Sequence, residues 1–358
     1  MENYTAPKCG LKREDFQKEV NGKAVDLFFL TNENGMEVAV TNYGGSLVAI
    51  MVPDRNGNYA NVIQGHDNID DCLNSPEPFL STLVGRYGNR ICKGRFTLNG
   101  KEYHLAVNNG PNHLHGGPEG FQNKVWESRV NDGAVEFLYV AEDGEMGYPG
   151  TLKAVARYEW SEENELRLTL TAECDAPTII NLTNHAYFNL DGEGSGSVLG
   201  HKLWLNAVQY LPTDESLVPL GDSEMVKGTP MDFSTEKTLG QDIKADFPAL
   251  NYGKGYDNCY VIENWEEGQL QTAAVLSSEK SGRVLEVVTT QPGVQIYTGN
   301  WLAGCPVGKC GRSYEDYDGV AIECQHFPDS PNKEGYPSVT LRPGEVYQEA
   351  IIFAFKTL

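Results

Sequence analysis

The chain has 358 residues, of which 40% are hydrophobic and 22% are charged, so it can bury a sizeable core and is not a disordered tail. Its 28 Lys and Arg residues against 50 Asp and Glu residues give a net charge of −22, which repels nucleic-acid phosphates and anionic membrane surfaces. We therefore expect neither nucleic acid nor a membrane as a partner, and the oligomeric state stays open, a monomer included.

Neither the start of the chain nor its cysteines indicate export. The first 16 residues, MENYTAPKCGLKREDF, lack the apolar stretch of a signal peptide, and no uncharged apolar run elsewhere is long enough to span a bilayer. Because disulfide scaffolds pack their cysteines more densely, we expect reduced thiols and a cytoplasmic protein. The eight cysteines are scattered without CxxC pairs, at Cys9, Cys72, Cys92, Cys174, Cys259, Cys305, Cys310 and Cys324.

Short β-prone segments follow one another along the chain. Strands are predicted at residues 36–41, 95–98, 102–107, 134–140, 152–160, 165–172, 283–290 and 350–355. Asn-Gly or Asp-Gly pairs, which favour tight hairpin turns, occur at 21–22, 34–35, 56–57, 99–100, 109–110, 132–133, 143–144, 191–192 and 318–319. A helix is expected only at 78–84, with a further turn near 238–244.

This pattern predicts a large antiparallel β-structure. Alternating βαβ units are absent, which excludes Rossmann and TIM-barrel architectures and leaves an antiparallel sandwich or barrel. The sequence shows no repeat of fixed period, no low-complexity tract and no Pro/Ser-rich linker. A single domain over residues 1–358 is the simplest organisation.

The first segment that suggests chemistry is residues 85–91, Gly-Arg-Tyr-Gly-Asn-Arg-Ile. Its small residues let a ligand approach the backbone, and Asn89 and Arg90 could donate hydrogen bonds to several sugar hydroxyls. Taken alone, the segment is explained more simply as a glycine-rich turn with solvated arginines.

The second segment is residues 112–117, Asn-His-Leu-His-Gly-Gly. If it is extended, His113 and His115 share one face, which is a common way to present two imidazoles to a metal. With Glu119 the segment matches the first half of the cupin metal motif, but the flanking glycines are missing and no second half follows. We expect instead a metal-free pair, in which one imidazole hydrogen-bonds a substrate and the other supports the loop.

The third segment, residues 178–190, carries an unusually polar face for so β-prone a run. In an extended chain Asn181, Thr183, His185 and Tyr187 point to the same side. A lone histidine in such a place is more often structural than functional, so His185 becomes a candidate only through a partner elsewhere in the chain.

That partner is Glu323, which ends an apolar strand within residues 319–329. A histidine and a glutamate, each at the end of an apolar strand, are the pair needed for proton transfer at two oxygens of one small substrate. Surface glutamates are far commoner than catalytic ones, so the position of Glu323 alone does not establish its role.

Two later polar residues have simple explanations of their own. Asp257, within residues 253–258, would be a turn aspartate, and Gln295, within 291–297, a strand-surface amide. Their neighbours Tyr256 and Tyr297 could stack on a sugar ring, although such tyrosines more often pack in the core.

Taken in order, these segments resemble the aldose 1-epimerases, or galactose mutarotases. Any one of them is a weak signal, but the ordered set is highly specific. The resemblance covers nearly the whole chain, at residues 41–45, 85–91, 112–117, 147–150, 181–190, 289–300, 323–329 and 341–347.

The resemblance implies a large antiparallel β-supersandwich of the galactose mutarotase type, with a sugar cleft on its concave face and no metal or other cofactor. It also implies Glu323 as general base, His185 as general acid and His115 as a second active-site histidine. In one departure, Asn258, followed by Cys259, stands where many members have a histidine directly after the aspartate. The residues implied to contact the sugar are Asn89, Arg90, Asp257 and Gln295.

The implied activity is the interconversion of the α and β anomers of free aldoses such as glucose and galactose, with Glu323 ionised and His185 protonated in the productive state. Three alternatives stay open. A hexose-6-phosphate mutarotase would need a cationic subsite, against which the net charge argues. A non-catalytic sugar-binding protein would require neither Glu323 nor His185, and a cupin-like metal enzyme would require further ligands. Which aldose is preferred is not predicted.

Overall fold

The structure, a computed structural model, describes residues 7–131, 133–305 and 307–358. Within these ranges almost all regular structure is strand, and neighbouring strands pair antiparallel throughout. The predicted antiparallel all-β class is therefore confirmed. Residues 1–6 of the N-terminal segment and Asp132 of the predicted 132–133 turn lie outside the described residues.

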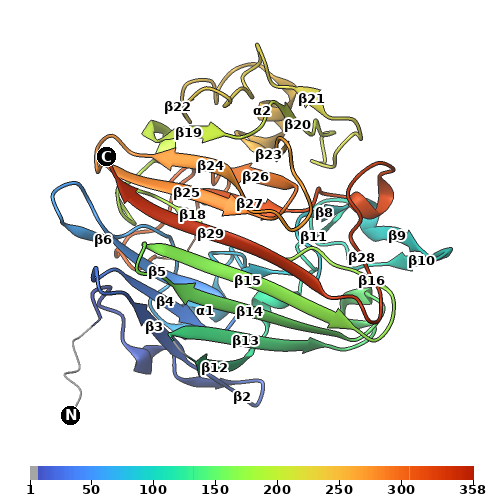
Figure 1. Ribbon diagram of the computed structural model, residues 1–358, viewed down its shortest axis with the longest axis horizontal. Helices are drawn as coiled ribbons and strands as arrows, with labels where there is room; N and C mark the ends of the chain where they lie inside the picture. Colours follow the sequence, from blue (N-terminus) through green and yellow to red (C-terminus); the bar gives the residue numbers. More distant parts are fainter. Residues whose placement is uncertain (1–6, 132, 306) are drawn as a thin grey trace.

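A nine-stranded sheet forms one layer of the molecule and faces the viewer in Figure 1. In β14 and β15 the buried residues alternate with more exposed ones, because only one face of this sheet meets the core. Its strand order is β12 (Glu127–Asn131), β13 (Ala134–Ala141), β14 (Leu152–Trp160), β15 (Glu165–Cys174), β29 (Tyr347–Thr357), β25 (Arg283–Thr289), β24 (Gln271–Ser277), β19 (Lys202–Leu205) and β22 (Lys237–Thr238).

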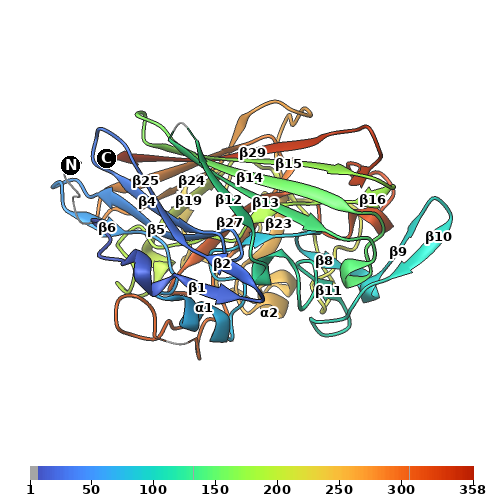
Figure 2. The same ribbon diagram turned by 90° about the horizontal axis from the view of Figure 1, so that it is seen from below.

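Two further sheets lie in a second layer, which Figure 2 shows beneath the first. The six-stranded sheet has the order β18 (Tyr187–Phe188), β27 (Val320–Gln325), β26 (Gly293–Tyr297), β23 (Asp257–Val261), β20 (Gln209–Tyr210) and β21 (Glu224–Met225). The four-stranded sheet has the order β3 (Leu27–Thr31), β4 (Glu37–Thr41), β5 (Ser46–Pro53) and β6 (Tyr59–Asn61).

Short elements complete the described part of the chain. Two-stranded ladders pair β1 (Lys18–Val20) with β2 (Lys23–Val25), β9 (Arg95–Leu98) with β10 (Lys101–His104), β8 (Arg90–Ile91) with β11 (His113–Leu114), β7 (Leu83–Val84) with β17 (Thr183–Asn184), and β16 (Thr178–Ile179) with β28 (Thr340–Leu341). The helices are α1 (Ile69–Asn74) and α2 (Pro248–Gly253), with 3-10 turns η1 (Arg13–Asp15), η2 (Cys92–Gly94), η3 (Phe121–Asn123), η4 (Glu145–Gly147), η5 (Val198–Gly200) and η6 (Ser330–Asn332).

One large hydrophobic cluster fills the space between the two layers. It contains Phe353 of β29, Ile322 of β27 and Val40 of β4, so all three large sheets contribute to it. The rings of Phe188 and Phe353 pack across the layers with centroids 5.2 Å apart. The six-stranded sheet thus uses one face for the core and leaves its other face for a binding site.

The predicted strands are confirmed, with two of them, 95–98 and 152–160, matching β9 and β14 residue for residue. The predicted 102–107 strand ends earlier, at His104. The helix predicted at 78–84 is wrong: residues 78–81 form a turn, and Leu83 and Val84 pair with β17 instead. The turn near 238–244 is confirmed. No helix in the described part of the chain is both long and apolar enough to cross a membrane.

Candidate active site

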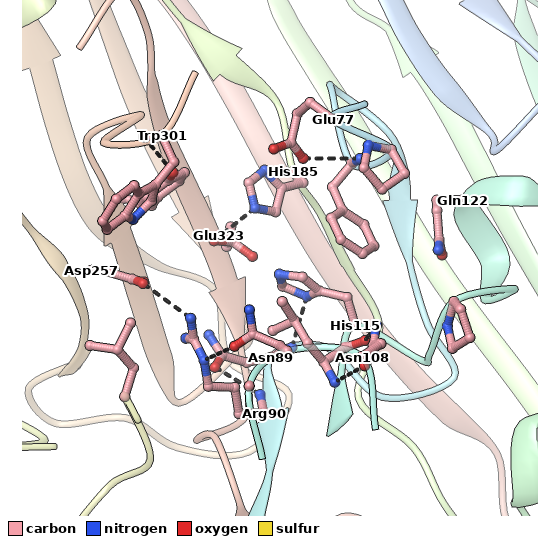
Figure 3. Close-up of a pocket in the computed structure, with 18 of the residues that line it drawn as sticks. Glu77, Asn89, Arg90, Asn108, His115, Gln122, His185, Asp257, Trp301 and Glu323 are labelled. Carbon is pink, nitrogen blue, oxygen red and sulfur yellow. Dashed lines mark hydrogen bonds and ion pairs between the residues drawn. The ribbon is translucent and has the colours of Figure 1, made fainter. Parts of the chain in front are cut away.

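A cavity of about 960 Å³ lies over the outer face of the six-stranded sheet. Figure 3 shows that the predicted site residues Glu323, His185, His115, Asn89, Arg90 and Asp257 converge in it. Its other walls come from loops at residues 76–79, 108–111 and 215–217, with Tyr187, Tyr297 and Trp301. A space of this size suits a small organic ligand.

Strand β27 places Glu323 in the cavity. All six of its residues are buried, because Ile322 and Cys324 point into the core while Glu323 points to the opposite face. The Glu323 side chain is only 2% exposed. Across the ladder, Gln295 of β26 stands directly opposite it, so the two side chains share the cavity side of the sheet.

Two hydrogen bonds place His185 beside that strand. Asn181 accepts a hydrogen bond from the backbone N–H of His326 at 2.9 Å, and the Thr183 hydroxyl donates to the Cys324 carbonyl at 2.7 Å. Both bonds hold the segment that carries His185 against β27. The polar face that the sequence predicted for residues 181–187 is therefore used partly to attach the segment and partly to line the cavity with His185 and Tyr187.

His185 and Glu323 form a buried pair. Nε2 of His185 lies 3.5 Å from Oε1 of Glu323, while Nδ1 of the histidine and Oε2 of the glutamate have no partner among the described residues. Burial lowers the pKa of His185 to about 4. Burial, together with the negative charge of Asp257, raises the pKa of Glu323 well above its usual value, although Arg90 acts in the opposite direction. The protein alone therefore favours a neutral pair, whereas the sequence-based mechanism expects a charged pair in the productive state.

His115 presents a hydrogen-bond donor to the cavity. The backbone N–H of Asn89 donates to Nδ1 of His115 at 3.0 Å, so that nitrogen must keep its lone pair. In the neutral imidazole the proton then lies on Nε2. Burial lowers the pKa of His115 well below its usual value, which keeps the ring neutral. The ring packs edge-on against His185, with centroids 5.2 Å apart.

Four further predicted residues form a connected polar network. Arg90 lies 3.3 Å from Asp257 and donates from Nε to Asn109 at 3.1 Å, and Gln295 donates to Asp257 at 2.6 Å. Asn89 accepts from the backbone N–H of Arg90 at 2.8 Å. Asn89, Arg90 and Asp257 line the cavity, but Gln295 is not among the lining residues. The structure thus brings Gln295 to the site behind Asp257 rather than at the cavity surface.

Asn258 does not take part in this network. It follows Asp257 in β23, so its side chain points to the opposite face of the sheet, where its two polar atoms are buried without a partner in the described chain. Asp257 is supported instead by Arg90 and Gln295. Asn258, which stands at the position of the family histidine, therefore makes none of the contacts that hold Asp257.

The metal interpretation of His113 and His115 finds no support in their surroundings. His113 contacts the Ala106 carbonyl and the Tyr148 hydroxyl, each at 2.6 Å, so it supports the loop as expected for one member of the pair. The metal-capable atoms that do converge in the described residues belong to His115, His185 and Glu323, within 4.8 Å of one another. A metal needs a nitrogen lone pair, and the cavity-facing Nε2 of His115 carries a proton as long as Asn89 donates to Nδ1.

Sequence reasoning missed Glu77, Phe79 and Trp301, which all line the cavity. Phe79 packs against both active-site imidazoles, with ring centroids 4.6 Å from His115 and 6.3 Å from His185. Only the adjacent prolines hinted at an ordered loop around Glu77. Of the two tyrosines considered as stacking residues, Tyr297 lines the cavity, whereas Tyr256 is a core residue.

Comparison with known sequences shows close similarity over most of the chain. The family model described as aldose 1-epimerase matches residues 26–354. A galactose mutarotase of Bos taurus is 41% identical over 327 residues, which cover 91% of this chain and 93% of the relative. An aldose 1-epimerase of Escherichia coli K12 is 36% identical over 338 residues, which cover 94% and 96%.

Solved structures show the same fold. An aldose epimerase homologue from C. elegans has a TM-score of 0.85 and 31% identity, and the match covers 94% of this chain and 100% of that chain. A galactose 1-epimerase from Lactobacillus acidophilus has a TM-score of 0.83 and 30% identity, with coverage of 95% and 97%. The predicted β-supersandwich of the galactose mutarotase type is confirmed.

Proposed function

The chain belongs to the aldose 1-epimerase family, and we propose that it interconverts the α and β anomers of free aldoses such as glucose and galactose. Family membership makes it a carbohydrate isomerase. The observation that supports specific roles for residues is the buried Glu323–His185 pair, because both residues line a sugar-sized cavity and each has a polar atom without a partner among the described residues.

Glu323 is the general base for ring opening. Its carboxylate takes the proton from the C1 hydroxyl, and the electron pair of that O–H bond forms the aldehyde carbonyl as the bond from C1 to the ring oxygen breaks. The aldehyde then rotates about its bond to C2. Ring closure on the other face runs the same proton transfers in reverse, so Glu323 returns the proton to the C1 oxygen.

His185 is the general acid that protonates the ring oxygen as it leaves C1. The 3.5 Å separation from Glu323 is longer than a hydrogen bond, which leaves the two groups free to act on two different oxygens of one sugar. His115, whose Nε2–H points into the same space, donates a hydrogen bond to the sugar and so holds it in reach of both groups.

The charged form of the pair is favoured by the substrate itself. A C1 hydroxyl that donates to Glu323 stabilises the carboxylate and lowers its pKa, and the adjacent carboxylate in turn favours protonated His185. Because the neutral and charged pairs hold the same number of protons, one transfer between Glu323 and His185 converts the form that burial favours into the productive one.

Arg90, Asp257 and Asn89 bind the remaining sugar hydroxyls. Their fixed network offers guanidinium and amide donors and a carboxylate acceptor on one wall of the cavity, which matches the alternating donor and acceptor character of a pyranose. Gln295 contributes by holding Asp257 rather than by lining the wall.

The alternative of a hexose-6-phosphate substrate is less well supported. Among the described residues that line the cavity, Arg90 is the only lysine or arginine, and it is already paired with Asp257. Lys254, whose Nζ lies 4.6 Å from the centre of the Trp301 ring, is paired with Asp316. A phosphate would therefore find no unpaired cation to bind.

We further propose a cytoplasmic location and no nucleic-acid or membrane partner. All eight cysteines are free thiols, which fits a reducing compartment. The net charge of −22 opposes association with anionic polymers and surfaces.

Polarimetry on freshly dissolved α-D-galactose and α-D-glucose tests the proposed activity. The protein should speed the approach to anomeric equilibrium over a buffer blank, and glucose 6-phosphate should respond far less. If no aldose in a panel equilibrates faster than its blank while sugars still bind, the protein is a sugar-binding protein and the proposed activity is wrong.

A further inference from the structure

Glu77 is an acidic residue of the cavity that the proposed mechanism does not use. It lines the cavity together with His185, Tyr187, Tyr297 and Glu323. Figure 3 shows its side chain on the same side of the site as His185. Its position raises the question of which substituent of a sugar it faces.

The loop that carries Glu77 is held firmly in place. Pro76 and Pro78 flank the residue, so the chain has little freedom on either side of it. Ser75 donates its hydroxyl to the Glu77 carbonyl at 3.0 Å, and Oε1 of Glu77 accepts from the Phe79 backbone N–H at 3.2 Å. Phe79 itself packs on His115. The carboxyl is thus fixed relative to the active-site imidazoles.

No cation balances this carboxyl. In residues 7–131, 133–305 and 307–358, the Phe79 N–H is its only hydrogen-bond partner, and it forms no ion pair. The charge of Glu77 raises the pKa values of four ionisable groups, and none of these groups is positive. They are Tyr187, Tyr297, Cys305 and Glu323. Burial raises the pKa of Glu77 to about 7, as expected for a carboxyl without a counter-charge.

The whole cavity shares this imbalance. Apart from Glu323, whose charge His185 balances in either form of the pair, its lining contains three carboxyl side chains, Glu77, Glu215 and Asp257, against the single guanidinium of Arg90, which Asp257 already pairs. An ammonium group on a bound sugar would therefore gain a partner, whereas a carboxylate or phosphate group would be repelled.

We propose that Glu77 sets the charge preference of the cavity, so that aldoses bearing an ammonium group, the amino sugars, are accepted as substrates and aldoses bearing an anionic group are rejected. This inference rests on the proposed mutarotase function and extends it to a further class of substrate. A neutral aldose gains only a hydroxyl-to-carboxyl hydrogen bond from Glu77, which an amide can replace.

The test compares kcat/KM for D-galactose, D-galactosamine and D-galacturonate in the wild type and in Glu77→Gln, slightly above pH 7, by polarimetry or NMR. Glutamine keeps the shape and a hydrogen-bonding oxygen but removes the charge. We expect the galactosamine-to-galactose ratio to fall, and the galacturonate-to-galactose ratio to rise, each by about threefold or more. Ratios are used because any effect of Glu77 on Glu323 is common to all three sugars.

Glu127→Gln, on the exposed edge strand β12, removes the same charge far from the cavity and should leave both ratios unchanged. Calorimetric binding of the same sugars to both proteins provides a readout that does not depend on turnover. If both ratios in Glu77→Gln equal those of the wild type, the role of Glu77 is wrong while the proposed function stands. If the wild type accelerates none of the sugars, the proposed function fails instead.

Discussion

The hydroxyl of Thr183 donates a hydrogen bond to the backbone carbonyl of Cys324 at 2.7 Å, and so joins the segment of His185 to the strand of Glu323. Thr183 lies two residues before His185, and Cys324 directly follows Glu323, so the bond joins the two members of the proposed catalytic pair. Thr183 and Cys324 are both fully buried. The spacing of the acid and the base therefore depends on a bond that neither of them makes.

Thr183→Val tests this dependence. Valine keeps the shape but leaves the Cys324 carbonyl without its partner, which should cost about 1–3 kcal/mol of stability. We expect kcat to fall on the order of tenfold with KM little changed, because the reacting groups lose their alignment. Thr41→Val removes a part-buried bond from the Thr41 hydroxyl to the Asp26 carbonyl at 2.8 Å, and with it the bond that the hydroxyl accepts from the Tyr43 backbone N–H at 3.3 Å; Thr41 is not among the residues that line the cavity. This variant should lose stability without loss of kcat, and equal losses of kcat in both variants would contradict the positioning role.

The proposed base and acid are tested by Glu323→Gln and His185→Asn. Glutamine cannot take a proton and asparagine cannot deliver one, so each change should lower kcat on the order of 10²–10⁴-fold. His104→Asn, which replaces an exposed histidine, is the matched control and should keep wild-type kcat. A Glu323→Gln variant that is folded by circular dichroism and retains near wild-type kcat would show that Glu323 is not the base, and Asp257 would be examined next.

Arg90→Lys should affect sugar binding rather than turnover. The guanidinium spans Asp257 and Asn109 at once, a planar arrangement that an ammonium group cannot reproduce. Because we expect Arg90 to hold the sugar equally in the ground state and the transition state, the loss of this geometry should raise KM while kcat changes little. Polarimetry over a range of galactose concentrations separates the two constants. A large fall in kcat with unchanged KM would place Arg90 in the chemical step.

Activity should survive exhaustive chelation. The cavity-facing nitrogen of His115 carries a proton because Nδ1 accepts from the Asn89 backbone, and His113 is occupied by Ala106 and Tyr148. Neither histidine therefore offers a free lone pair toward a metal in the cavity. The measurement is kcat/KM before and after dialysis against EDTA, with metal analysis of the same samples. Loss of rate that one divalent ion restores would overturn the metal-free mechanism.

Much of the fold could be predicted because burial on one face of a sheet leaves a period of two in the sequence. The segment 152–160 is the clearest example, since its alternation gives β14 without error. Glu323 stood out for a related reason: the apolar pattern breaks at this carboxyl, where the sequence predicted the strand to end, although β27 continues to Gln325. The structure explains this break, because β27 has the core on one face and the cavity on the other.

The rest could not be predicted because it depends on pairing between distant segments. The two-residue strands β7 and β17 are too short to carry a period, so the turn at 78–81 was mistaken for the start of a helix. The contact of Gln295 with Asp257 follows from the register of β26 against β23, which no local pattern reveals. Glu77 lies in a loop whose place over the cavity is set by tertiary packing alone.

Buried histidines should make the protein less stable in mild acid. Burial lowers the pKa of His66, His113, His185, His201 and His326 to about 4 in the folded protein, against about 6.5 when unfolded. Between these values the unfolded chain binds more protons, so stability falls as pH falls from about 6.5 to 4. Glu77 and Glu349, with pKa values raised by burial to about 7, act in the opposite direction, as do Glu323 and Asp329, whose pKa values burial also raises, but these carboxyls are fewer than the histidines.

The expected result is a Tm that falls by several degrees between pH 6.5 and 4.5 in scanning calorimetry, since each net proton contributes about 1.4 kcal/mol per pH unit. His326→Gln provides a specific test, because glutamine can keep a hydrogen bond to Gln291 but cannot titrate. Its stability should depend less steeply on pH, by about one proton. The control His104→Gln changes an exposed histidine and should keep the wild-type slope. A Tm that is the same at both pH values in the wild type would show that the buried imidazoles do not remain neutral as their burial requires.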